Sequence, residues 1–224
     1  MRAELKSARK SVAREYAEAF LFAIILTIFI RTFVVQAFRI PSGSMENTLL
    51  VGDFLFVNKF IYGANVPFTD IELPAVREPR RGDVIVFKYP VDTRKDFIKR
   101  VIGLPGDKLE IRDKVVYIND QPLDESYAHF SAGRIRSRGL NDARVFPSGT
   151  GNKDNYGPIE IPPGKLFMMG DNRDNSDDSR FWGFLDESLI KGKAILIYWS
   201  WDHDTRLAGF FPQPRFERIG DLIQ

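Results

Sequence analysis

The sequence predicts a mainly β protein preceded by one apolar helix, and three observations lead to this fold class. Residues 17–38 form a single long apolar segment. From residue 39 onward, short apolar runs alternate with turn-forming residues, which is typical of an all-β domain. No internal repeat and no sustained helical heptad interrupts this pattern. With 224 residues, 44% of them hydrophobic, the chain can bury a sizeable core, and we expect one domain with a large insertion.

The apolar segment 17–38 is expected to cross a membrane as a helix, because its 22 positions match the length of about 20 residues that a bilayer requires. Arg31 lies in its second half, from where the side chain can reach the far interface. The tail of residues 1–16 has five basic and two acidic residues, a net charge of +3. This charge predicts a cytoplasmic N-terminus, with residue 39 and the rest of the chain outside.

A cleavable secretory signal is the alternative interpretation of the same segment. A basic stretch precedes the short apolar run 19–30, and residues 35–37 loosely fit a small-x-small cleavage site. A buried amphipathic helix of a soluble domain does not fit, because residues 19–30 contain no charged residue on any face. Both export interpretations place the remainder of the chain outside the cytoplasm.

Six apolar runs are predicted to form strands: 49–60, 82–90, 96–107, 108–120, 164–171 and 193–201. Residues 184–191 indicate one or two helical turns. The stretch 119–160 is rich in Gly, Ser, Asn and Arg and is expected to be an exposed insertion. The expected parts are a cytoplasmic tail (1–16), a transmembrane helix (17–38), a β domain (39–107 and 166–224) and an inserted β subdomain or loop region (108–165).

Composition excludes several classes of function. The basic excess lies in residues 1–16, so the other 208 residues carry a net charge of −1, which argues against a nucleic-acid partner. The absence of Cys excludes thiolate metal sites and cysteine nucleophiles. His129 and His203 are the only histidines and form no zinc motif.

A calcium loop is also excluded, although four Asp residues lie between 171 and 178. An EF-hand loop needs Gly at its sixth position and Glu at its twelfth, and counting from Asp171 these positions hold Ser176 and Trp182. We therefore expect no metal and no cofactor.

Two residue types suggest acyl-transfer chemistry. Ser44 lies in a Pro-Ser-Gly-Ser turn that can present a hydroxyl. Lys99 lies in an apolar strand, but alternation alone does not decide whether Lys99 or Arg100 faces the interior. Only the lysine can serve as a base, because arginine stays protonated whereas a desolvated lysine can lose its proton near neutrality.

Three segments of the chain, FRIPSGSM (38–45), FIKRVIGLPGD (97–107) and GDNRDNSDDSRFWGF (170–184), resemble in sequence and order the signature blocks of bacterial type I signal peptidases. RGDVIVFKYP (81–90) and the apolar segment extend the resemblance to most of the chain outside 119–160. The family is one of serine peptidases with a Ser/Lys dyad. The resemblance implies an antiparallel β-sheet catalytic domain with an inserted smaller β subdomain and one N-terminal transmembrane helix.

The resemblance also assigns roles to individual residues. Ser44 would be the nucleophile and Lys99 the general base, with the Ser42 hydroxyl and the Ser44 N–H as the oxyanion hole. Ser176 would hydrogen-bond the Lys99 amine and orient it. The supporting ion pairs would be Asp178 with Arg180 and Asp171 with Arg100.

Signal peptides of exported preproteins are the implied substrates, cut after Ala-x-Ala. The implied walls of the shallow substrate pockets are all apolar: Phe38, Ile40, Met45, Leu49, Val86 and Ile98. The substrate is expected as an added strand near residues 84–88 and 96–98. Asn47 departs from the family, which commonly has Pro there, and this departure bears on the rigidity of the loop.

The implied location is the bacterial inner membrane, spanned once, with the catalytic part on the outer side. Membrane lipid and the protein export machinery would be neighbours. Ser44 follows Phe38 by six residues, about 20 Å of extended chain, so the site would lie near the membrane surface. Contact of Trp199, Trp201, Phe210 and Phe211 with lipid stays open. Two other functions also stay open: a maturation peptidase of one conjugation or pilus system, and a catalytically silent domain that binds exported peptides.

Overall fold

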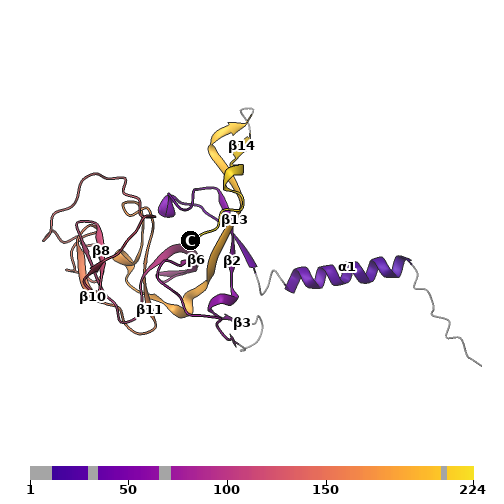
Figure 1. Cartoon of the computed structure of the whole chain (residues 1–224), viewed down its shortest axis with the longest axis horizontal. Coiled ribbons are helices and arrows are strands. Elements are labelled where there is room, and N and C mark those ends of the chain that lie inside the picture. Colours follow the sequence, from indigo (N-terminus) through magenta and orange to yellow (C-terminus); the bar gives the residue numbers. More distant parts are fainter. Residues whose placement is uncertain (1–11, 30–34, 66–71, 208–210) are drawn as a thin grey trace, which may run out of the picture.

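The computed structural model describes residues 12–29, 35–65, 72–207 and 211–224, and its strands form two main antiparallel sheets (Figure 1). The larger sheet has eight strands in the order β1 (Val35–Arg39), β2 (Asp53–Asn58), β13 (Ile190–Leu207), β5 (Val84–Tyr89), β6 (Asp92–Gly103), β11 (Lys165–Met169) and β12 (Leu185–Asp186), with β14 (Phe211–Pro214) paired to β13. This architecture confirms the predicted mainly β fold class.

The smaller sheet has four strands in the order β10 (Tyr156–Glu160), β7 (Lys108–Arg112), β8 (Val115–Ile118) and β9 (Gln121–Pro122). Leu109 and Ile111 of β7 are buried while its charged residues face outward, the alternation that a half-exposed strand requires. These residues share a buried cluster with Ile102 of β6 and Phe167 of β11, which joins the two sheets. A short hairpin, β3 (Ala64–Asn65) with β4 (Glu72–Leu73), completes the described strands.

A second buried cluster lies between β1, β2, β5 and β13. In β2, Leu55 and Val57 point into this cluster, while Phe56 stacks on Tyr198 across the other face at 4.3 Å between ring centroids. Residues Val84 to Phe87 of β5 are all buried, because this strand has a neighbour on each edge and packing on both faces.

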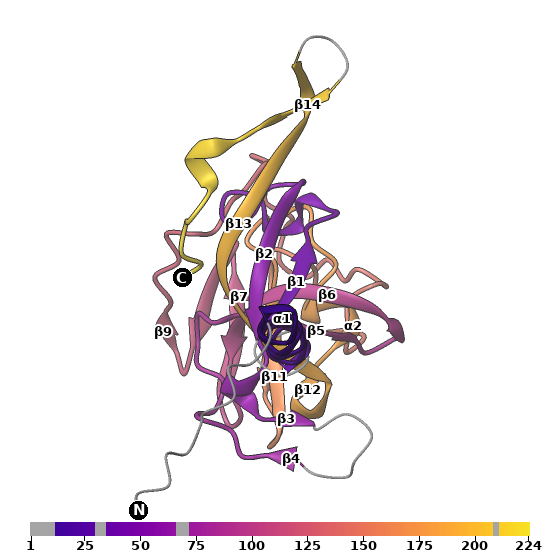
Figure 2. The same cartoon turned by 90° about the vertical axis from the view of Figure 1, so that its right-hand side faces the viewer.

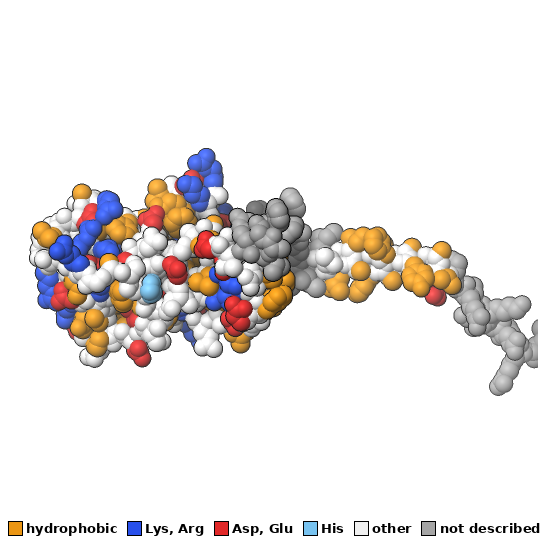
Figure 3. Space-filling view, turned by 90° about the horizontal axis from the view of Figure 1, so that it is seen from above, with side chains coloured by type: hydrophobic (Ala, Val, Ile, Leu, Met, Phe, Trp, Pro, Cys, Tyr) orange, Lys and Arg blue, Asp and Glu red, His pale blue; other side chains and the backbone are white. Residues whose placement is uncertain are grey.

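The helix α1 (Val12–Phe29) projects away from the sheets (Figure 1) and carries exposed apolar side chains along its length (Figure 3). The predicted helix 17–38 is wrong at its C-terminal end, because residues 35–38 belong to β1 and pair with β2, with Phe38 opposite Leu55. Arg31 and most of the tail 1–16 lie outside the described residues. No helix in the described part of the chain combines the length and apolar content needed to span a membrane.

The predicted helical turns at 184–191 occur as β12 and a 3-10 turn, Glu187–Leu189. A short helix that sequence did not predict, α2 (Ser179–Trp182), precedes them. It begins where the Asp178 side chain accepts a hydrogen bond from the backbone N–H of Arg180, and it ends at Gly183, whose φ of 86° favours glycine.

The strands β13 and β14 extend together beyond the rest of the sheet (Figure 2). Trp199 and Trp201 lie on β13, are half-buried and pack edge to face, with ring centroids 5.2 Å apart. Phe216 packs on Trp199 and is itself 67% exposed. The side chains of Phe210 and Phe211 lie outside the described residues.

Candidate active site

Ser44 lies in a single 3-10 turn, Gly43–Met45, between β1 and β2. The next residue, Met45, is fully buried in the cluster that contains Ile40 and Leu49, and the backbone N–H of Leu49 donates to the Met45 carbonyl at 2.8 Å. This anchoring fixes the turn and leaves the Ser44 side chain only slightly exposed. Asn47 has a φ of 91°, which Asn tolerates and which Pro cannot adopt, so the departure from the family at this position matches the backbone.

Lys99 reaches Ser44 from β6. A hydrogen bond of 2.6 Å joins Lys99 Nζ to Ser44 Oγ, and the same amine donates to the carbonyl of Ile98 at 3.1 Å. Lys99 is 4% exposed, and burial lowers its pKa to about 8 although nearby carboxylates, Asp178 foremost, act in the opposite direction. A substantial fraction of these amines is therefore neutral near pH 8.

Arg100 is buried as well, because both faces of this part of β6 are covered. Its guanidinium binds Asp171 through two hydrogen bonds of 2.8 and 2.6 Å, and it stacks at 3.9 Å on the Tyr127 ring. Asp171 also accepts a 2.5 Å hydrogen bond from the Thr48 hydroxyl. This pair ties the loop after Ser44 to the loop after β11.

Asp178 and Arg180 form a second buried pair. Both guanidinium contacts with the carboxylate measure 2.8 Å, and the backbone N–H of Gly170 donates to the same carboxylate at 3.2 Å. Burial alone would raise the Asp178 pKa, but the charge and hydrogen bonds of Arg180, with hydrogen bonds from Ser176 and the Gly170 backbone, lower this pKa. Arg180 also donates to the carbonyls of Arg173 and Lys153.

Ser176 lies close to the dyad but makes no hydrogen bond to Lys99, whose contacts go to Ser44 and Ile98. The Ser176 hydroxyl is buried and lies near the Asp178 carboxylate, whose pKa it helps to lower, although the geometry of this contact is poor. It packs over Gly170, where an added Cβ would lie 2.3 Å from Ser176 Oγ and 2.4 Å from the Ser44 carbonyl oxygen. Only glycine at this position lets the 170–178 loop approach the nucleophile.

Asn172 is a contact residue that sequence reasoning missed. Its backbone N–H donates to the Ser44 carbonyl at 3.1 Å, and its side-chain amide donates to the Gly43 carbonyl at 3.2 Å and to Glu46 at 3.1 Å. These bonds hold the turn that carries Ser44 from the side of the 170–178 loop. In the sequence Asn172 stands out only by its position between Asp171 and Arg173, and this position does not predict hydrogen bonds to a distant backbone.

The six apolar residues expected to contact substrate gather in one cluster. Ile40, Met45, Leu49 and Val86 are buried there, while Phe38 and Ile98 are partly exposed at its surface. Ser42 is exposed, in extended conformation, and its side chain makes no capping hydrogen bond.

The edge expected at residues 84–88 does not exist, because β5 pairs with β13 on one side and β6 on the other. Two of the strand edges left unpaired within the described chain border the apolar cluster: the outer edge of β1, and the side of β6 at residues 96–98 where β11 does not reach. Phe38 lies on the first strand and Ile98 on the second.

A buried serine within hydrogen-bonding distance of a lysine of lowered pKa is typical of serine hydrolases that use lysine in place of histidine. Among the described residues, no group of three or more His, Asp or Glu side chains is arranged to hold a metal ion.

Comparison with known proteins agrees with this class. Residues 13–199 match the family model described as signal peptidase, peptidase S26. The chain is 37% identical to the signal peptidase I of Pseudomonas aeruginosa, over 92% of this chain and 78% of that protein, and 38% identical to that of Pseudomonas fluorescens over the same shares. It is 34% identical to the signal peptidase I of Rickettsia typhi, over 87% and 85%. The chain therefore belongs to the signal peptidase family, peptidase S26, which comprises serine peptidases.

A crystal structure of a signal peptidase I from Enterococcus faecalis V583 is also similar, with 31% identity and a TM-score of 0.42 over 53% of this chain and 98% of that one.

Proposed function

We propose that this chain removes N-terminal signal peptides from exported preproteins, with Ser44 as nucleophile and Lys99 as general base. The observation that carries the proposal is the 2.6 Å contact between Lys99 Nζ and Ser44 Oγ in a buried setting where the Lys99 pKa falls to about 8. A general base is most effective when its pKa lies near the working pH. Family membership supports the same reaction.

In this mechanism the neutral Lys99 amine takes the Ser44 hydroxyl proton as Oγ attacks the carbonyl carbon of the scissile bond. The resulting ammonium gives this proton to the leaving amine of the mature protein, and an acyl-enzyme remains on Ser44. Water then attacks the ester carbonyl while Lys99 accepts its proton. The Lys99 ammonium returns this proton to Ser44 Oγ as the ester C–O bond breaks, which restores the hydroxyl and frees the signal peptide with a carboxyl end that ionises in water.

The tetrahedral intermediate would be stabilised by the backbone N–H of Ser44 and the hydroxyl of Ser42. No capping hydrogen bond holds the Ser42 side chain, so its hydroxyl can turn toward a developing oxyanion. Each such donor is typically worth a factor of about 10²–10³ in rate.

Asp178, Arg180, Asp171 and Arg100 would support the dyad without touching the reacting atoms. Arg180 compensates the charge of Asp178, which would otherwise hold Lys99 protonated to higher pH. Asp171 and Arg100 fix the two loops that meet at Ser44. Ser176 would orient the amine only after a small rotation of its hydroxyl or on substrate binding.

The signal peptide would lie as a strand in the slot between the free edges of β1 and β6. Phe38 and Ile98 border this slot, and the well-packed residues Ile40, Met45, Leu49 and Val86 form its floor. A floor without large openings accepts small side chains, which supports cleavage after Ala-x-Ala.

We further propose that α1 and the residues that follow it anchor the chain in the inner membrane, with the N-terminus in the cytoplasm and the β domain (39–107 and 166–224) outside. The support is the run of exposed apolar side chains on α1, from Phe20 to Leu26. Residues 108–165 would form the inserted subdomain. Lipid and the export machinery would then be neighbours of the site.

The test is cleavage of a purified preprotein with an Ala-x-Ala site by the full chain in detergent, with the cut position determined by mass. Ser44→Ala and Lys99→Ala should abolish cleavage without loss of fold, whereas Lys95→Ala, an exposed lysine of the same strand, should cleave normally. Near-normal turnover by either dyad variant would refute the mechanism. A preprotein that binds to the wild-type chain but stays intact would instead identify a silent binding domain.

A further inference from the structure

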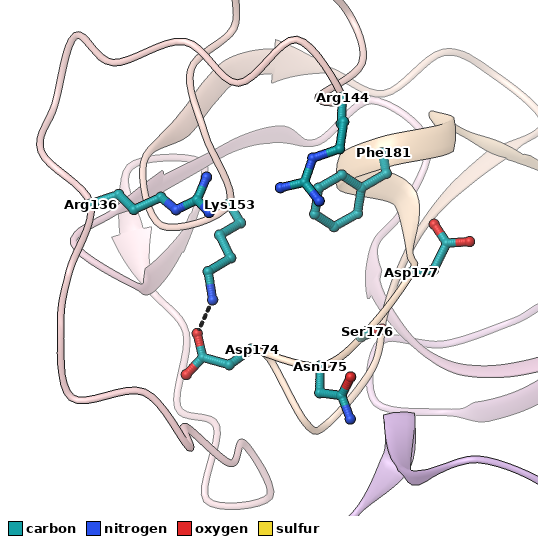
Figure 4. Close-up of a pocket in the computed structure, with 8 residues that line it drawn as sticks. All are labelled: Arg136, Arg144, Lys153, Asp174, Asn175, Ser176, Asp177 and Phe181. Carbon is teal, nitrogen blue, oxygen red and sulfur yellow. Dashed lines mark hydrogen bonds and ion pairs between the residues drawn. The ribbon is translucent and has the colours of Figure 1, made fainter.

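A charged cavity of about 480 Å³ lies beside the dyad (Figure 4). One wall is the 170–178 loop, with Asp174 to Asp177, and the opposite wall comes from the insertion, with Arg136, Arg144 and Lys153. Phe181 of α2 lies under the Arg144 guanidinium, 5.8 Å from ring centroid to charge. Figure 4 shows Arg144 directed toward the open centre and Lys153 directed toward the Asp174 carboxylate, with which it forms an ion pair.

Ser176 connects this cavity to the turn that carries Ser44. Ser176 lines the cavity, and Ser176 packs on Gly170, which in turn lies against the Ser44 carbonyl. Asn172 of the same loop donates to that carbonyl at 3.1 Å. A peptide bound across Ser44 therefore has this cavity within a few residues of its scissile bond.

The strand register decides which part of the peptide arrives there. Beside residues 96–98, the edge of β6 is unpaired within the described chain, but from Arg100 onward the same edge is taken by β11, where Met169 lies opposite Arg100. A substrate strand beside 96–98 cannot continue along β6 past Lys99. The apolar floor for the signal peptide lies on the 96–98 side, so the chain after the scissile bond leaves where β11 ends and the 170–178 loop begins.

The far wall of the cavity has an excess of positive charge. Arg136 and Arg144 share one carboxylate, that of Asp142, at 2.7 and 2.8 Å. Lys153 and Lys114 share another, that of Asp174, and Lys114 also approaches Asp154 at 3.9 Å. Four basic groups therefore face three carboxylates, an excess of one positive charge. The near end differs, because Asp177, bound to the Tyr89 hydroxyl at 3.3 Å, places a negative charge close to the dyad.

We propose that this cavity binds the first residues of the mature protein and favours acidic side chains about two to four residues after the cleaved bond, a reach set by roughly 3.3 Å per extended residue. Directly after the bond, the Asp177 carboxylate disfavours an acid. The inference rests on the proposed function and adds a mature-side preference to it.

The experiment compares two preproteins with the same Ala-x-Ala site, one with Asp-Glu-Asp and one with Ser-Thr-Ser at the second to fourth mature residues. Wild type should cleave the acidic substrate with a kcat/KM about 3- to 10-fold higher, as expected for partly exposed charge pairs. Raising the salt should reduce the ratio. Arg144→Glu and Arg136→Glu should abolish or invert this ratio of kcat/KM values.

Arg138→Glu is the matched control, since Arg138 is exposed in the same insertion but pairs with Asp113 and does not line this cavity. It should keep the wild-type ratio. Equal cleavage of both substrates by wild type, or the same change in all three variants, would overturn the inference while leaving the proposed function intact. Failure of wild type to cleave either substrate would overturn the proposed function and, with it, this inference.

Discussion

Arg180 neutralises Asp178 inside the protein, with two guanidinium contacts of 2.8 Å to a carboxylate that is wholly buried near Lys99. After the effect of burial, the charges of Asp178 and Arg180 act on the Lys99 pKa in opposite directions, upward and downward. The ion pair therefore limits the rise of the Lys99 pKa that Asp178 alone would cause, and it also compensates a buried charge in the fold.

Arg180→Met should leave Asp178 uncompensated and raise the Lys99 pKa. We expect the pH profile of kcat/KM to move to higher pH and the free energy of unfolding to fall by about 3–5 kcal/mol, as for other broken buried pairs. Asp178→Asn should move the profile the other way. Shifts of both variants in the same direction would contradict this electrostatic account.

Activity of the wild-type chain should depend on pH through Lys99. Its pKa of about 8 means that the neutral, proton-accepting amine gains population as the pH rises through that value. A plot of kcat/KM for the free enzyme should rise between pH 6 and about 9 and then level off. A flat profile over this range would argue against a lysine base.

The free energy of unfolding should also depend on pH through Lys99, because burial lowers the pKa of this amine in the folded state. The folded-state pKa of Lys99 lies below its ordinary 10.5, so between about pH 8 and 10.5 the unfolded chain holds more protons and stability rises with pH. The destabilisation is fully present below pH 8 and corresponds to about 3 kcal/mol. Lys99→Met should thus increase the free energy of unfolding more at pH 7 than at pH 10, measured by urea denaturation. Lys95→Met, exposed on the same strand, should show no such difference.

Gly170→Ala should abolish most of the activity, because the added methyl group would clash with Ser176 and Ser44. The added Cβ would lie 2.3 Å from Ser176 Oγ and 2.4 Å from the Ser44 carbonyl oxygen, so the 170–178 loop must shift away from the nucleophile. We expect a large drop in kcat and a loss of about 1–3 kcal/mol in stability. Gly133→Ala meets open space and serves as the control.

Ser176→Ala should reduce activity far less than Lys99→Ala, because the Ser176 hydroxyl makes no hydrogen bond to the amine. The buried hydroxyl contacts the Asp178 carboxylate in poor geometry, so its removal should change the melting temperature little. The measurement is kcat at saturating substrate together with the melting temperature. A loss as complete as that of Lys99→Ala would show that the hydroxyl is indispensable to the base.

Sequence was sufficient where the pattern is local. The apolar run 108–120 predicted a strand, and the structure divides it into β7 and β8. The resemblance of the segments around Ser44 and Lys99 to the family's signature blocks implied the pair that the fold brings together. The C-terminal end of the predicted helix was wrong, because a segment as short as residues 35–39 can form either helix or strand. Only its pairing with β2 decides between the two.

Contacts between distant segments were beyond reach of the sequence. Asn172 donates hydrogen bonds to the backbone carbonyls of Ser44 and Gly43, and a contact with backbone carbonyls leaves no pattern in the residue types of the sequence. The interior edges of β5 depend on β13, more than a hundred residues later in the chain. The charged cavity exists only because the insertion folds back over the 170–178 loop.

The two unpaired edges of β1 and β6 have a consequence for turnover. The main-chain hydrogen bonds that would hold the signal peptide lie on the acyl side of the cut, so hydrolysis does not break them. The cleaved signal peptide would therefore stay docked after the mature protein has departed, and it would act as a competitive inhibitor of the next cycle. Under this arrangement product release would be the slow step, and a membrane that takes up the apolar fragment into lipid would accelerate turnover.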